Sequence, residues 1–136
     1  MNKEQMAAHV AELAKANNIH IYWSSHRGCA FRKLTTVKIR PVRSAVTYAV
    51  ALHELGHVLG PMQTGRRLFM EAGAWLWARD NASVWTDAMT RMMVKCLRSY
   101  ERTYRHLAKR RPGNPPVFPP EGHDFWRLIE LGERLK

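Results

Sequence analysis

The segment ALHELGHVLG, residues 51 to 60, holds the side chains with the clearest capacity for chemistry. His53 and His57 are four residues apart, and Glu54 directly follows the first histidine. Because four residues bring an α-helix back to the same face, the two imidazoles of a helical segment could bind one metal ion. Glu54 would then lie beside that ion, where a carboxylate can act as a general base.

A catalytic zinc site needs a third protein ligand, because zinc in enzymes usually takes three and keeps one position for water. A metzincin would continue the motif as HxxGxxH, and Gln63 in place of the last histidine excludes that class. Glu71 is the preferred ligand, since it lies fourteen residues after His57 on the next predicted helix and precedes small residues that allow close helix packing. The alternatives that the sequence leaves open are Asp80, Asp87, His106 and His123.

The motif depends on a helix predicted over residues 45 to 59, with Ser44 as its N-cap and Gly60-Pro61 at its end. This segment has almost no polar face, so the helix should be buried. Buried imidazoles and a buried carboxylate need compensating partners, and a bound cation would supply them. Two other interpretations stay open: a core helix whose polar groups bond to neighbours, and a structural zinc without catalysis.

The remaining pattern predicts an α+β protein in which a small antiparallel or mixed sheet packs on this helix and the C-terminal half is mostly helical. Residues 1–111 form the predicted domain, 112–120 a proline-rich connector, and 121–136 an amphipathic helix that docks back through Phe125 and Trp126. The other predicted segments are helices over 2–17, 67–82 and 85 to about 110, the last capped by Ser83, and strands over 19–23, 30–34 and 35–40.

The pair of segments HELGHVLG and EAGAWLWA resembles the ImmA/IrrE group of small gluzincin-like metallopeptidases, which occur in phages and mobile elements. The likeness covers roughly residues 19 to 83. It implies a zincin-like core with a strand before the motif helix. It also implies that His53, His57 and Glu71 are the Zn²⁺ ligands and that Glu54 is the catalytic glutamate.

Positive charge dominates the composition, with 22 Lys and Arg against 11 Asp and Glu and a formal net charge of +11. Residues 27 to 43 hold six basic residues and no acid. A second basic row lies along the predicted 85–110 helix, and it either serves as a solvated face or contacts phosphates or an acidic protein. We call it the basic row: Arg91, Lys95, Arg98, Arg102, Arg105 and Lys109.

The sequence therefore predicts a zinc-dependent metallopeptidase of the endopeptidase class, in which Glu54 activates a water for attack on a peptide bond. An extended substrate could pair with the edge of the 36–40 strand, and Tyr100, Tyr104 or His106 could stabilise the oxyanion. The alternative is a nucleic-acid-associated protein with a structural or degenerate zinc site. Only two cysteines, no secretory leader and no apolar run of membrane-spanning length favour the cytoplasm of a bacterial or phage-infected cell.

Overall fold

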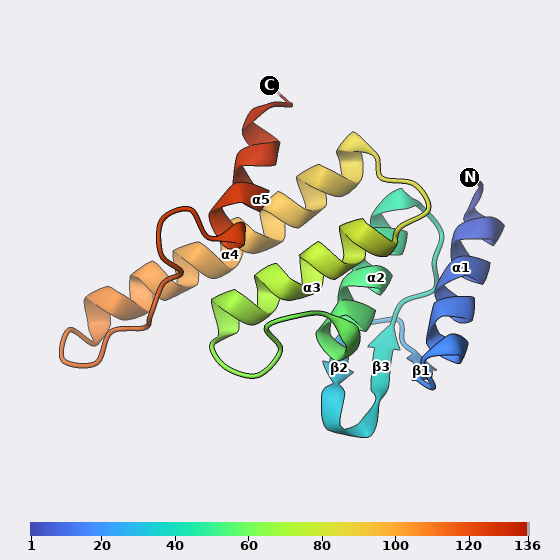
Figure 1. Cartoon of the computed structure of the whole chain (residues 1–136), viewed down its shortest axis with the longest axis horizontal. Coiled ribbons are helices and arrows are strands. Elements are labelled where there is room, and N and C mark those ends of the chain that lie inside the picture. The colour runs from blue at the N-terminus through green and yellow to red at the C-terminus, as the bar shows by residue number, and fades with distance from the viewer. Residues whose placement is uncertain (136) are drawn as a thin grey trace.

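Figure 1 shows the computed structural model, which describes residues 1–135. Five α-helices and a three-stranded mixed sheet make up its regular structure, and the second half of this part of the chain is mostly helical. The α+β prediction is confirmed. In chain order the elements are α1 (Lys3–Ala16), β1 (His20–Trp23), β2 (Cys29–Phe31), the 3₁₀ turn η1 (Arg32–Leu34), β3 (Thr36–Ile39), α2 (Ala45–Leu59), α3 (Arg67–Asn81), α4 (Asp87–Arg110) and α5 (Asp124–Glu133).

The strand order is β1-β3-β2, with β1 parallel and β2 antiparallel to β3. The prediction that the 36–40 strand offers a free edge is wrong, because β3 is hydrogen-bonded on both sides. The free edges belong to β1 and β2. The predicted 30–34 strand is also too long: pairing stops at Phe31, and the chain turns through η1 to Thr35, which has a left-handed φ of 46°.

Helix α2 is the centre of the packing and contacts α1, α3, α4, β2 and β3. Ser44 caps it as predicted: its side chain accepts a hydrogen bond from the Thr47 backbone, and the Thr47 side chain bonds back to the Ser44 backbone. Gly60 ends the helix. Within residues 1–135, none of the helices combines the length and apolar character that crossing a bilayer demands.

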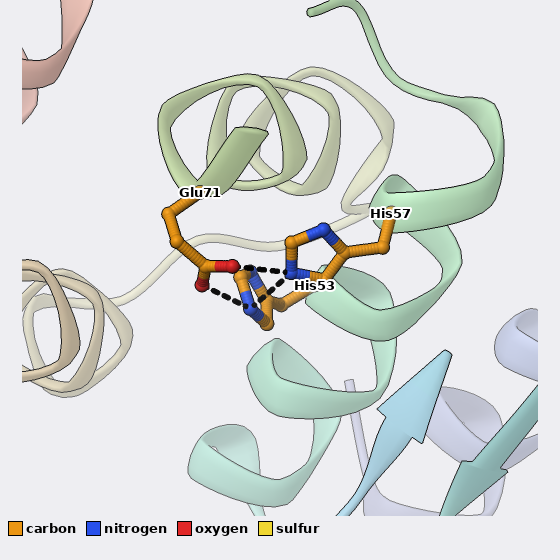
Figure 2. A group of neighbouring side chains, drawn as sticks. All are labelled: His53, His57 and Glu71. Atoms are coloured by element: carbon orange, nitrogen blue, oxygen red, sulfur yellow. Dashed lines mark hydrogen bonds and ion pairs between the residues drawn. The ribbon is translucent and has the colours of Figure 1, made fainter. Parts of the chain in front are cut away.

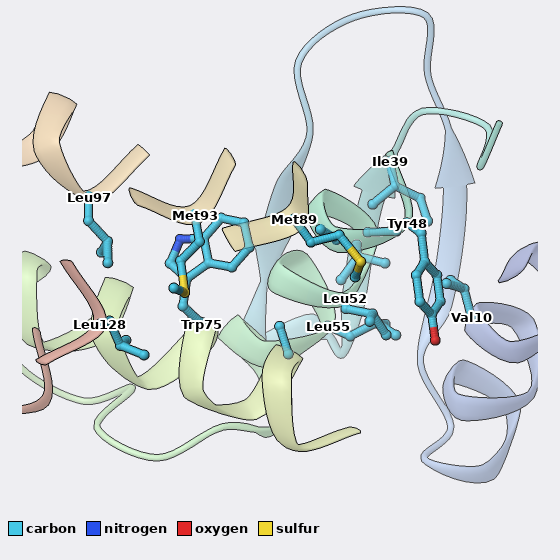
Figure 3. Packing of buried hydrophobic residues seen from close by; sticks show 14 of the residues in the cluster. Val10, Ile39, Tyr48, Leu52, Leu55, Trp75, Met89, Met93, Leu97 and Leu128 are labelled. Atoms are coloured by element: carbon cyan, nitrogen blue, oxygen red, sulfur yellow. The ribbon is translucent and has the colours of Figure 1, made fainter. Parts of the chain in front are cut away.

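The hydrophobic core runs from α1 across β3 and α2 to α3, α4 and α5, as Figure 3 shows for part of it. The Tyr48 side chain is fully buried, and its hydroxyl contacts His9 Nδ1 and accepts a hydrogen bond from the Ser83 backbone. The prediction that Ser83 caps α4 is wrong, because Thr86 is the N-cap of this helix. Helix α5 adds three buried side chains to the same core: Phe125, Leu128 and Ile129.

Two glycines let α2 and α3 approach each other closely. A Cβ atom on Gly56 would overlap the carbonyl oxygen of Ala74, and one on Gly73 would overlap the carbonyl oxygen of Pro61. Both obstacles are backbone atoms, which a side-chain rotation cannot remove. The glycines thus set the distance between the helix that carries the histidines and the helix that carries Glu71.

We predict that Gly73→Ala destabilises the protein by about 1 to 3 kcal/mol, the usual range for overpacking. The sign is informative, because glycine to alanine within a helix otherwise stabilises by about 1 kcal/mol. Urea unfolding of the variant measures this difference. Ser99→Ala, at an exposed position inside α4, is the control and should be neutral or slightly stabilising. Equal stability of Gly73→Ala and wild type would contradict the proposed contact.

Candidate metal centre

Three side chains from two helices converge at the surface of α2 that faces α3 (Figure 2). His57 Nε2 lies 3.1 Å from His53 Nε2 and 2.9 Å from Glu71 Oε2, and His53 Nε2 lies 3.2 Å from Glu71 Oε1. The side chains are 12% exposed at most. Residues 53 and 57 share one face of α2, as the four-residue spacing predicts, and α3 brings Glu71 opposite them.

Gln63 determines which nitrogen of His57 carries a proton. The Gln63 amide nitrogen donates to the carbonyl oxygens of Pro61 and Met70, so the amide oxygen is the atom that faces His57 Nδ1, at 2.9 Å. Nδ1 is therefore the donor. In the neutral imidazole, the lone pair of His57 is then on Nε2 and points at Glu71 and His53.

This arrangement fits a bound cation. Two imidazole nitrogens and a carboxylate oxygen, one ligand atom from each residue, lie within 4.8 Å of one another. Without a proton or a cation between them, such electron-rich atoms at these distances repel. A tetrahedral zinc with bonds of about 2.1 Å holds its ligand atoms about 3.4 Å apart, close to the observed 2.9, 3.1 and 3.2 Å. His53, His57 and Glu71 could therefore hold a metal ion.

The electrostatics keep Glu71 ionised. Burial alone would raise its pKa, but His53 and His57, in the form protonated on Nε2, outweigh burial and lower the pKa of Glu71 to about 2. Arg67, one turn earlier on α3, adds a positive charge 3.5 Å from Oε2. Burial disfavours the charged form of His57, and the adjacent Glu71 carboxylate reverses that effect and raises the pKa of His57.

Glu54 lies beside the three side chains without belonging to them. Its Oε1 atom is 3.7 Å from His53 Nε2, and its Oε2 atom is buried with no hydrogen-bond partner among residues 1–135. Burial raises the pKa of Glu54, although His53 and His57 act in the opposite direction. Gly28 leaves room for this side chain, because a Cβ there would lie 3.4 Å from Glu54 Cγ and 2.9 Å from the Lys38 carbonyl oxygen.

Trp75 fixes the plane of the His53 ring. The two rings stack with centroids 4.2 Å apart and planes 24° from parallel, and the indole is fully buried. The tryptophan comes one helical turn after Glu71, so α3 supplies a ligand and a supporting ring on the same face. Trp75 thus belongs to the hydrophobic core and also holds the His53 ring in place.

Two cavities share Glu54 in their lining. The apolar cavity, of about 320 Å³, lies between the start of α2 and α4 and includes Val46, Val50 and Met92. The polar cavity, of about 300 Å³, lies between β2 and α3 and includes Cys29 and Gln63. Five residues line both and therefore mark where the cavities meet: Gly28, His53, Glu54, Glu71 and Tyr100.

The structure separates the remaining candidates. Among residues 1–135, no metal-binding group includes Asp80, Asp87, His106 or His123. Of the three possible oxyanion donors, Tyr100 lines both cavities, whereas Tyr104 and His106 line neither. Burial and the Glu71 charge raise the pKa of Tyr100, so its hydroxyl keeps its proton.

The basic row lies on α4, and two of its members are already paired. Arg98 contacts Glu101 and Glu133, and Arg105 contacts Glu101 and lies over the rings of Phe118 and Trp126. These bonds tie α4 to α5 and to the preceding connector. The other four side chains of the basic row are exposed and form no ion pair within residues 1–135. They are Arg91, Lys95, Arg102 and Lys109.

The Glu101 pairs predict a pH-dependent contribution to stability. Burial opposes the charge of Glu101, but hydrogen bonds from Arg105 and Arg98 prevail and lower its pKa. Because the pKa is lower in the folded state, the stabilisation is present above the unfolded pKa and disappears as pH falls through the folded one. Glu101→Gln should lower the free energy of unfolding by about 1 kcal/mol at pH 7, and urea unfolding should show this difference shrink at acidic pH. A constant difference would rule out the charge as its cause.

Gln63 should influence metal affinity without touching the metal. Removing the hydrogen-bond partner of a ligating histidine typically weakens binding by about 10- to 100-fold, and we expect this of Gln63→Ala. Competition with a chromophoric chelator measures it, at a temperature where circular dichroism shows the variant folded. The neighbouring exposed Thr64 supplies the control, Thr64→Ala. Unchanged affinity in Gln63→Ala would mean that the amide does not orient His57.

Sequence reasoning missed the roles of Gln63, Trp75, Arg67 and Gly28. From the sequence, Gln63 indicates only that the chain is not a metzincin. Its place in the motif was nevertheless a usable signal, since the chain after Gly60 must return close to His57 to begin the next helix. The other three act through tertiary proximity, and no spacing in the sequence marks them.

No protein-family model, curated protein or solved structure matches this chain.

Proposed function

We propose that the chain is a zinc-dependent peptidase of the ImmA/IrrE kind, in which His53, His57 and Glu71 bind the ion and Glu54 is the general base. The observation that carries this proposal is the convergence of the three ligand atoms with a fourth buried side chain beside them, the carboxylate of Glu54, whose Oε2 atom has no hydrogen-bond partner among residues 1–135. A purely structural site has no use for that carboxylate. Structural zinc is also normally closed by four protein ligands, whereas the candidate group found among residues 1–135 has three.

The chain's own residues would divide the work as follows. A bound zinc ion would polarise the scissile carbonyl and lower the pKa of the attacking water. Glu54 takes the proton from that water and delivers it to the leaving amine nitrogen. The buried position of Glu54 suits both steps, because the raised pKa makes its carboxylate a stronger base. Tyr100 is placed to donate a hydrogen bond to the developing oxyanion, since its side chain lines both cavities.

The free edge of β2 is where an extended substrate would bind. Gly28, Cys29 and Ala30 line the polar cavity beside His53 and Glu54, and β2 is hydrogen-bonded to β3 on one side only. A peptide that adds a strand here would pass across the ligand group. The edge of β2 replaces the edge of the 36–40 strand as the proposed substrate-binding edge, because β3 has no free edge.

Metal reconstitution tests the proposal. The protein is stripped with a chelator, reloaded with zinc and incubated with a peptide library from a bacterial lysate, and new termini are identified by mass spectrometry. We expect one zinc per chain, cleavage by the loaded protein, and loss of cleavage with 1,10-phenanthroline. Stoichiometric zinc without any new terminus would contradict a peptidase.

The exposed members of the basic row support a second candidate, a nucleic-acid contact. Arg91, Lys95, Arg102 and Lys109 form no ion pair in the described chain and could face phosphates. Binding to a DNA duplex would then weaken steeply as salt is raised. A flat salt response would exclude phosphate contact.

A further inference from the structure

The charges around the two cavities are strongly unequal. Four arginines line them: Arg27 and Arg40 in the apolar cavity, Arg32 and Arg67 in the polar cavity. The acidic residues that line them are Glu71, one of the three candidate ligands, and Glu54, which lies beside those ligands. We call the two cavities together the cleft. Apart from these two glutamates, every charged side chain that lines the cleft is therefore positive.

Three of these arginines have no acidic partner. Within residues 1–135, Arg27, Arg32 and Arg40 form no ion pair, and all three are exposed. They come from three separate segments: the loop before β2, the turn η1 and the residue after β3. Unpaired cations gathered from different segments around one cleft create a positive potential that favours an anionic ligand.

The apolar cavity limits what that ligand can be. Its walls include Ile39, Val46, Val50, Ala51 and Met92, and Arg27 and Arg40 are its arginines. A volume of about 320 Å³ is at the lower end for a small-molecule pocket, which suits one large aliphatic or aromatic side chain. An aliphatic or aromatic peptide side chain matches these aliphatic walls better than a nucleobase does, because the edges of a base carry hydrogen-bonding groups that the walls would leave without partners.

We propose that the cleft selects an acidic peptide segment, with one bulky apolar side chain in the apolar cavity and acidic side chains on both sides of it. Arg27 and Arg40 bind the acidic residues on the apolar side, and Arg32 binds those on the polar side. The identity of this ligand as a substrate rests on the proposed peptidase function. The binding itself does not, and the experiment keeps the two apart.

The test measures binding in the absence of cleavage. The zinc-loaded Glu54→Gln variant is titrated into a fluorescein-labelled, end-capped peptide of glutamates with a central leucine, and fluorescence anisotropy gives Kd. Matched peptides replace glutamate by glutamine, or the central leucine by serine. We expect each replacement to weaken binding by about tenfold. The first loses several exposed ion pairs, and the second loses one buried apolar side chain.

Charge-matched variants locate the contact. In the Glu54→Gln background, Arg27→Gln/Arg32→Gln removes one unpaired arginine from each cavity, and Arg91→Gln/Arg102→Gln removes two exposed arginines of α4. The first pair should weaken binding of the glutamate peptide by about tenfold and the second by less than about twofold. Arg67 is left unchanged, because it contacts Glu71.

Each contrary result is specific. Equal binding of the glutamine peptide, or equal effects of the two arginine pairs, overturns selection for acidic residues by the cleft. Equal binding of the serine peptide overturns the role of the apolar cavity. A single-stranded oligonucleotide of the same charge serves as a competitor. If it displaces the peptide from the Glu54→Gln protein but not from the protein that also carries Arg27→Gln/Arg32→Gln, the cleft is a nucleic-acid site. Tight, leucine-dependent binding with no cleavage by zinc-loaded wild type would sink the peptidase and leave this inference standing.

Discussion

Glu54→Gln is expected to bind zinc as wild type does and to cleave about 10²- to 10⁴-fold more slowly, because a general base usually contributes a factor of this size. Gln keeps the size of Glu but cannot take a proton. Zinc should be retained because Glu54 lies 3.7 Å from the nearer imidazole nitrogen and Glu71 lies within 3.2 Å of both. Zinc content, measured by atomic absorption, and cleavage rate on the same preparation give the two numbers.

The control for Glu54→Gln is Glu12→Gln, which removes the same charge from an exposed position on α1. It should leave both zinc content and rate unchanged. If Glu54→Gln cleaves as fast as wild type, Glu54 is not the base, and the buried carboxylate has only a local electrostatic role. If zinc is lost together with activity, Glu54 belongs to the ligand set.

Glu71→Gln is expected to weaken zinc binding by more than about 100-fold, beyond the range for partners that do not touch the metal. The amide cannot supply the negative charge that the two imidazoles now face. A ligand that binds only the folded state stabilises it in proportion to the logarithm of its concentration over Kd. A 100-fold weaker site therefore loses about 2.7 kcal/mol of zinc-dependent stabilisation.

Thermal unfolding with and without zinc measures the effect of Glu71→Gln. Wild type should gain stability on zinc addition, and the variant should gain little. Asp80→Asn is the matched control, since Asp80 lies on the same helix, is exposed and was an alternative ligand in the sequence. A zinc response that survives Glu71→Gln and is lost in Asp80→Asn would place the ligand elsewhere.

Helices were the most predictable part of this fold, because apolar periodicity and capping residues are local signals. The helix over 45–59 is predicted to the residue, since Ser44 and Gly60 mark its two ends. The start of α4 was misplaced because Ser83 and Thr86 are both good caps. The Ser83 backbone bonds to Tyr48, a contact thirty-five residues away in sequence that no local pattern contains.

The sheet could be predicted only in part. Alternation identified β1 and β3 as strands, but alternation carries no information on which strand lies between the others. The ladder of β2 ends at Phe31 because the chain must turn back through η1 and Thr35 to reach β3. That turn depends on a left-handed residue other than glycine, which the sequence does not reveal.

The metal centre shows the same division. The spacing of His53 and His57 follows from helix geometry alone. Glu71 was one of five possible third ligands, and only the packing of α3 against α2 at Gly56 and Gly73 brings it within reach. Gln63 required knowledge of how the loop after Gly60 folds, and it is the residue that fixes the His57 proton.

The strand order has a consequence for synthesis on the ribosome. β3 is the last strand to be translated and the one that both others pair with. While the nascent chain ends before Thr36, β1 and β2 have no ladder partner, and Tyr22, Trp23 and Phe31, which stay exposed even afterwards, are free to adhere to other chains. Sheet assembly must therefore wait for residues 36–39 and then proceed on both sides of β3 at once, so pausing of translation just upstream would prolong the aggregation-prone interval.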